Sequence, residues 1–79
     1  MDGRKLRKFN RICNELAEFM REVHTENEDI YLYVAGESDT FAMLIDTDGE
    51  DIGSNHWRRN QDKCVLSEVE IPYADCGGI

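Results

Sequence analysis

Acidic side chains crowd the middle of this sequence, and carboxylates at that density can do two kinds of chemistry. The stretch from Glu26 to Ile52 contains nine acidic residues and no Lys or Arg. Carboxylate oxygens are the ligands that calcium prefers, and an array of uncompensated carboxylates also attracts a basic protein surface. A calcium site needs its ligands at fixed spacings, whereas attraction of a basic surface does not, so the spacing of the acids distinguishes the two.

The spacing around Asp48-Gly49 does not fit a calcium loop. Such a loop takes oxygen ligands from its first, third and fifth positions, has Gly at the sixth and ends with Glu at the twelfth. Counted from Asp46, the glycine falls at the fourth position and Trp57 occupies the twelfth. Asp-Gly is instead the dipeptide typical of a two-residue type I′ turn. We therefore expect a tight turn and no bound metal.

Cysteine and histidine do not indicate a zinc site or a nucleophile. Structural zinc sites bring their ligands in close pairs, whereas Cys13, Cys64 and Cys76 are far apart in the sequence. A catalytic cysteine needs a nearby histidine and an electropositive setting, and the spacing singles out no such pair. We expect three free thiols, with Cys13 in the core, and a protein that is not an enzyme and uses no cofactor.

Charge is segregated along the chain, whose formal net charge is −8. Residues 1–11 hold five basic residues and one acidic residue, whereas residues 26–52 carry acidic charges only. A strongly negative protein repels phosphate at long range, so a basic protein surface is the expected partner of the acidic stretch. Direct binding of nucleic acid is a weaker alternative, which would use the basic residues Arg4, Lys5, Arg7, Lys8, Arg11, Arg58 and Arg59.

Nothing in the sequence indicates a membrane protein. No apolar run approaches the roughly 20 residues of a membrane span, and the basic N-terminus lacks the apolar block of a secretory signal. An odd number of cysteines without close pairs is typical of a reducing compartment. The expected location is cytoplasmic, without membrane partners.

Hydrophobic periodicity predicts one helix followed by strands. Apolar residues recur every three or four positions from Leu6 to Val23, which indicates an amphipathic helix over residues 3–24 with Asp2 as its cap. Alternation of apolar and polar residues predicts strands at 29–35, 40–47, 50–53 and 63–71. The third strand would follow the Asp48-Gly49 turn and pair Ile52 with Ile45. Residues 56–62 are expected to form a loop, with Trp57 in the core, and residues 72–79 a tail.

The expected fold is a single α+β domain, with the N-terminal helix packed on one face of a three- to four-stranded antiparallel sheet. One helix covers one sheet face. We expect it to cover Ile30, Leu32, Val34, Phe41, Met43 and Ile45. The opposite face would then carry an uncovered apolar and tyrosine-bearing patch made of Tyr31, Tyr33, Ala42 and Leu44.

Two functional hypotheses follow from charge and surface. In the first, the acidic hairpin mimics nucleic-acid phosphate and blocks a basic nucleic-acid-binding protein; in general character the chain then resembles phage-borne inhibitors such as anti-CRISPR proteins, although no motif carries that resemblance. In the second, the tyrosine face makes a homodimer of a structural or regulatory module. The candidate partner-binding residues are Glu37, Asp39, Asp46, Asp48, Glu50, Asp51, Tyr31 and Tyr33.

Overall fold

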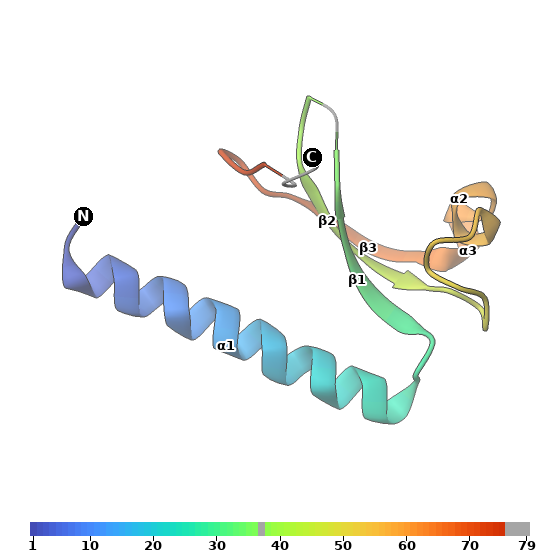
Figure 1. Cartoon of the computed structure of the whole chain (residues 1–79), viewed down its shortest axis with the longest axis horizontal. Coiled ribbons are helices and arrows are strands. Elements are labelled where there is room, and N and C mark those ends of the chain that lie inside the picture. Colours follow the sequence, from blue (N-terminus) through green and yellow to red (C-terminus); the bar gives the residue numbers. More distant parts are fainter. Residues whose placement is uncertain (37, 76–79) are drawn as a thin grey trace.

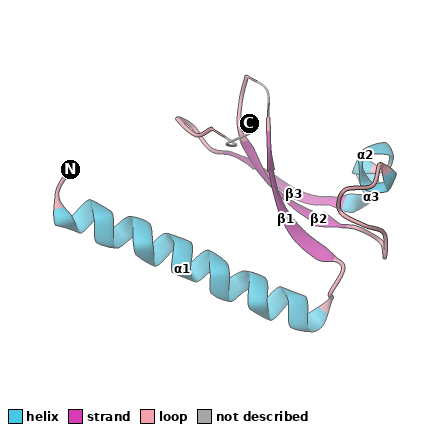
Figure 2. Ribbon diagram, in the orientation of Figure 1, coloured by secondary structure: helices cyan, strands magenta, loops and turns pink. Residues whose placement is uncertain are grey.

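The computed structural model describes residues 1–36 and 38–75 of the 79-residue chain. Its elements follow the order helix, two strands, two short helices and a final strand (Figures 1 and 2). They are α1 (Gly3–Glu26), β1 (Ile30–Ala35), β2 (Phe41–Asp46), α2 (His56–Arg59), α3 (Gln61–Cys64) and β3 (Val65–Glu70). The expected α+β class, with an N-terminal helix and an antiparallel sheet, is confirmed. Glu37 and the segment Cys76–Ile79 lie outside the described residues.

Helix α1 begins where the sequence predicts. The Asp2 carboxylate accepts a hydrogen bond from the Lys5 backbone N–H at 3.0 Å, which satisfies one of the free donors of the first turn. The helix ends at Glu26, two residues beyond the predicted end, and the Asn27 N–H still donates to the Val23 carbonyl. The cap and the apolar periodicity are local properties of the chain, so they predicted this element well.

The three strands form a sheet in the order β1-β2-β3, with both pairs antiparallel. Leu32 is opposite Leu44, and Tyr33 is opposite Met43. Side chains on a strand alternate between the faces, so the register defines two surfaces. The helix-side face carries Ile30, Leu32, Val34, Ala42, Leu44 and Val69, and the Trp57-side face carries Tyr31, Tyr33, Phe41, Met43, Ile45 and Val65.

The predicted face was therefore right for Ile30, Leu32 and Val34 and wrong for the residues of β2. Phe41, Met43 and Ile45 share a face with the tyrosines instead of lying beneath α1. The connection between β1 and β2 spans five residues, 36–40, because Thr40 does not belong to the strand. A four-residue turn had been expected, and a shift of one residue moves every side chain of a strand to the other face.

The core lies on the Trp57-side face and consists of Ile45, Trp57 and Cys64, with Tyr33, Met43, Ile52 and Val65 packed around it. Trp57 is only 4% exposed, which confirms it as a core residue. Its indole N–H donates to the Ile52 carbonyl at 2.9 Å. Segment 52–64 is thereby attached to the sheet.

The predicted strand at residues 50–53 was wrong, and so was the predicted loop at 56–62. Ile52 and Gly53 lie in turns, and the Ser54 N–H donates to the Asp51 carbonyl. The chain then forms α2 and α3 over the Trp57-side face. Burial of an indole removes far more apolar surface from water than pairing of a very short strand would. Packing of Trp57 on the sheet is therefore favoured over pairing of residues 50–53 with β2.

Cys13 was expected in the core but is exposed, and of the two cysteines that the structure describes Cys64 is the buried one. No residue of α1 is buried. Residues from the second half of the helix, Leu16, Phe19 and Met20, lie over the helix-side face. Figure 1 shows the first turns of α1 extending away from the strands, and this placement leaves Cys13 without a sheet surface to pack on.

Replacement of Trp57 by Phe tests this core. The smaller ring leaves a void and removes the donor to the Ile52 carbonyl, so the free energy of unfolding should fall by about 1–3 kcal/mol. Urea denaturation at fixed protein concentration measures the change. Tyr73→Phe is the control, because Tyr73 is fully exposed and its change should stay within about 0.5 kcal/mol. Equal unfolding midpoints for the two variants would contradict this account of the core.

Candidate interaction surfaces

The Asp48-Gly49 turn has the geometry that the sequence predicts. Both residues have positive φ angles, 56° and 81°, as a type I′ turn requires. The Glu50 N–H donates to the Thr47 carbonyl at 3.0 Å, and the Asp46 carboxylate accepts from the Asp48 N–H at 2.8 Å. Asp46 is thus occupied in shaping the turn.

Asp48 is paired with side chains of its own chain. Its carboxylate lies 2.9 Å from Lys63 Nζ and 3.2 Å from His56 Nε2. The hydrogen bond from Lys63, followed by that from His56, holds the pKa of Asp48 below its usual value, and the same carboxylate raises the pKa of Lys63. Asp48 therefore ties the turn to α2 and α3, and it is the least suited of the predicted acids to attract an outside partner.

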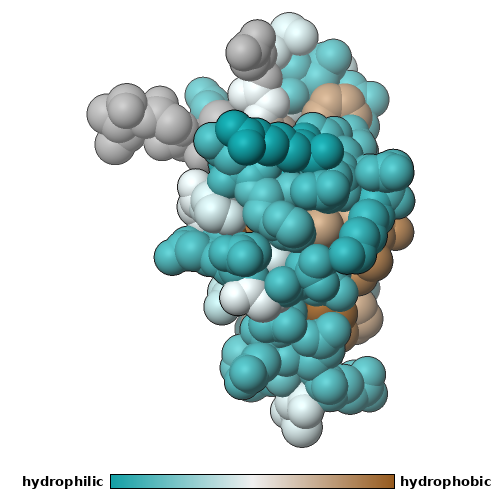
Figure 3. Space-filling view, turned by 90° about the vertical axis from the view of Figure 1, so that its right-hand side faces the viewer, coloured by the Kyte–Doolittle hydropathy of each residue, from teal (hydrophilic) through white to brown (hydrophobic). Residues whose placement is uncertain are grey.

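A polar groove of about 410 Å³ gathers four acids beside this turn. Thr47 is buried, and both its N–H and its hydroxyl donate to the Asp29 carbonyl. These bonds bring the end of α1 beside the turn. The groove is lined by Glu28, Asp29, Glu50 and Asp51 together with His24 and Tyr31. The end of the molecule that carries α2 and α3 is mostly hydrophilic (Figure 3).

The structure divides the predicted acids into two groups. Asp46, Asp48, Glu50 and Asp51 lie at one end of the β1–β2 hairpin, while Asp39 lies at the other end. A six-residue strand is about 20 Å long, which separates the groups beyond the screening length of about 8 Å at physiological salt. Glu28 and Asp29 belong to the groove but were absent from the predicted set. The pairing of Ile30 with Asp46 and the bonds from Thr47 to Asp29 bring them beside the turn.

The two predicted tyrosines have different surroundings. Tyr33 lies under the residues that follow the turn: its ring centre is 5.1 Å from that of Trp57 and 5.5 Å from Arg58 Cζ. Arg58 also lies 4.6 Å from the Trp57 ring centre and donates to the Tyr33 hydroxyl at 2.9 Å. Tyr31 remains 42% exposed and lines a groove. The two tyrosines therefore do not form one uncovered patch.

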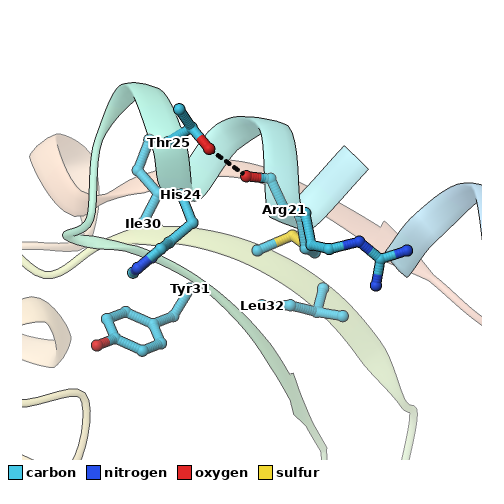
Figure 4. A pocket seen from close by; sticks show the side chains of 7 residues that line it. Arg21, His24, Thr25, Ile30, Tyr31 and Leu32 are labelled. Atoms are coloured by element: carbon cyan, nitrogen blue, oxygen red, sulfur yellow. Dashed lines mark hydrogen bonds between the residues drawn. The ribbon is translucent and has the colours of Figure 1, made fainter. Parts of the chain in front are cut away.

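An apolar opening lies instead between α1 and the sheet. A groove of about 580 Å³ runs along the second half of α1 and the start of β1, and Figure 4 shows the His24 and Tyr31 side chains at its rim. A second apolar groove of about 310 Å³ lies between Leu16 and Phe19 on one side and Leu44 and Val69 on the other. This surface could not be predicted from the sequence, because it depends on how loosely the helix covers the sheet.

The described part of the chain was also compared with the requirements of a metal site and of a membrane-spanning helix. Within residues 1–36 and 38–75, no three His, Cys, Asp or Glu side chains are grouped so that they could hold a metal ion. No helix in those ranges is long and apolar enough to cross a membrane.

Comparisons with protein-family models, with curated proteins and with solved structures found no match to this chain. The assignment of function therefore depends on the surfaces described above.

The Asp48 ion pairs can be tested by pH. Because the pKa of Asp48 is lowered in the fold, its contribution to stability is present at neutral pH and is lost as the pH falls through the usual value of 3.8 and then through the lowered pKa. Since the pKa of Lys63 is raised above 10.5, the pair is also lost in strong alkali. Asp48→Asn should lower the melting temperature slightly at neutral pH, and the difference should disappear in acid.

The measurement is thermal unfolding followed by circular dichroism across the pH range. Glu50→Gln is the matched control, because it removes the same charge from the same turn, where no ion pair to Glu50 is seen among the described residues. If Asp48→Asn and the wild type have the same melting temperature at neutral pH, these contacts do not stabilise the fold.

Proposed function

We propose that this protein is a non-enzymatic protein-interaction module, and that another protein chain packs on the exposed apolar side of α1. One observation carries the proposal: in a helix of 24 residues none is buried. Phe9 and Ile12 are 63% and 52% exposed. Soluble monomers rarely leave a contiguous apolar surface of this kind in water, and such surfaces are typical of protein interfaces.

Photo-crosslinking in the native cells tests this function without assuming a partner. A benzoylphenylalanine at position 9 should give a covalent product with a protein chain, because Phe9 lies on the apolar side. The same probe at Glu18 is the matched control, since nine residues rotate the helix by two and a half turns and place position 18 on the opposite side. No protein product from position 9, or equal products from both positions, would reject the proposal.

The second candidate is an acidic docking surface for a basic protein. The observation that favours it is the gathering of Glu28, Asp29, Glu50 and Asp51 around one polar groove. Charge of one sign steers a partner of the opposite sign and increases the association rate. An inhibitor of the phage or anti-CRISPR kind, in which these carboxylates take the place of nucleic-acid phosphates on a basic partner, is the most specific form of this second candidate.

Binding to an immobilised arginine-rich peptide tests the acidic surface. Conversion of the four groove acids to their amides should weaken binding by about tenfold or more, because several exposed charge pairs are lost together. Binding of the wild type should also weaken as salt rises. The matched control converts Asp39, Asp62, Glu68 and Glu70, which removes the same total charge from other places. Equal weakening in both variants would mean that only net charge matters.

A further inference from the structure

The exposed side of α1 contains a seam of the kind that pairs two helices. Phe9, Ile12, Leu16 and Phe19 are spaced by three, four and three residues, which is the spacing of core positions in a coiled coil. All four side chains are between 43% and 63% exposed. We name these four residues the exposed seam. Its second half, Leu16 and Phe19, also borders the groove over Leu44 and Val69, so a second helix on the exposed seam would lie along α1 and beside that groove.

The exposed area of the chain is large enough for a stable interface. The accessible surface is 6459 Å², whereas a compact monomer of 9.1 kDa exposes about 4,900 Å². The radius of gyration is 14.3 Å, against about 11.6 Å for a compact chain of this length. A standard interface removes about 800 Å² from each partner. The excess of roughly 1,600 Å² is spread over the whole chain, and it is larger than the area that one such interface removes from each partner.

The charges beside the exposed seam indicate which chain occupies it. Lys5 and Lys8 lie near its N-terminal end, whereas Glu22 and Glu26 lie near its C-terminal end, and all four are exposed. The wider helix shows the same polarity, since the basic residues of α1 other than Arg21 and His24 all precede its glutamates. A helix with one positive and one negative end is complementary to a copy of itself that runs in the opposite direction.

We infer that the chain on the exposed seam is a second copy of this protein, whose α1 packs antiparallel about a two-fold axis midway between Ile12 and Leu16. This inference rests on the proposed function, because it names the partner of the same surface. In an antiparallel pair Phe9 meets Phe19 of the second copy, and Ile12 meets Leu16. Lys8 lies beside Glu22 of that copy. The same surface serves both copies, as a two-fold interface requires.

The arrangement explains why a parallel pair is not expected. In a parallel pair Lys5 and Lys8 would adjoin the same residues of the other copy, and like charges repel. In the antiparallel pair the only like charges near each other are the two Glu15 side chains, because Glu15 flanks the exposed seam close to the axis. Substitution of Glu15 therefore gives a separate test of the antiparallel arrangement.

Charge reversal with purified protein tests the inference. The wild type should be a dimer at micromolar concentration by sedimentation equilibrium. Lys5→Glu/Lys8→Glu makes both ends of the seam acidic, and Glu22→Lys/Glu26→Lys makes both ends basic. Each variant should dimerise at least about tenfold more weakly, because four attractive pairs become repulsive. An equimolar mixture of the two should form a heterodimer.

Two further variants separate orientation from simple charge. The fourfold variant that combines both exchanges should dimerise like the wild type, because an antiparallel pair restores every opposite-charge contact. Glu15→Gln should tighten the dimer a few-fold, since it removes the repulsion at the axis. Circular dichroism of each variant confirms that the helix is intact, and the mixed heterodimer itself shows that both reversed variants still fold.

Each alternative result overturns the antiparallel pair. A monomeric wild type excludes a second copy as the partner. A dimer that neither reversal weakens forms elsewhere, for example by pairing of the exposed strand edges. Failure of the fourfold variant to dimerise excludes the antiparallel direction. The cellular crosslink from position 9 separates these failures from failure of the proposed function: a monomeric protein whose Phe9 probe captures a different protein keeps the function and loses the second copy.

Discussion

Burial of the Trp57 indole is the interaction on which the rest of this structure depends. The ring packs with Ile45 and Cys64 and donates to the Ile52 carbonyl, so residues 52–64 must turn back over one sheet face. That face is then partly covered by the chain itself. The other face is left to α1, whose second half lies over it without burying any residue of the helix. The difference between the two sheet faces, one with a buried core and one without, therefore starts from one aromatic side chain.

The acidic residues are divided between structural and surface roles. Asp46 and Asp48 are engaged by the turn and by Lys63, whereas Glu50 and Asp51 join Glu28 and Asp29 around the polar groove. Net charge alone cannot separate these roles, because a carboxylate that stabilises a turn and one that faces a partner look the same in a composition. The separation comes from hydrogen bonds between residues distant in sequence, above all those that Thr47 makes to the Asp29 carbonyl.

Features set by neighbouring residues could be predicted from the sequence. The Asp2 cap, the helix, the positive φ angles at Asp48-Gly49 and three of the strands depend on local spacing, and burial of Trp57 depends on its size. The faces of the sheet could not be predicted, because they depend on whether Thr40 belongs to the connection or to the strand. The placement of Cys13 in the core was wrong for a related reason: periodicity shows that a helix has an apolar side and does not show how much of that side meets the sheet.

The length of α1 has a consequence for how its first turns stay helical. A 24-residue helix spans about 36 Å, and the part near its N-terminus has the backbone ladder and the Asp2 cap to hold it but little tertiary packing. Peptide helices of that kind are marginal in water. Ordering of these turns and occupation of their apolar side are therefore coupled, so any chain that docks there also increases local helicity. The same stretch can change in sequence at little cost to the folding of the sheet.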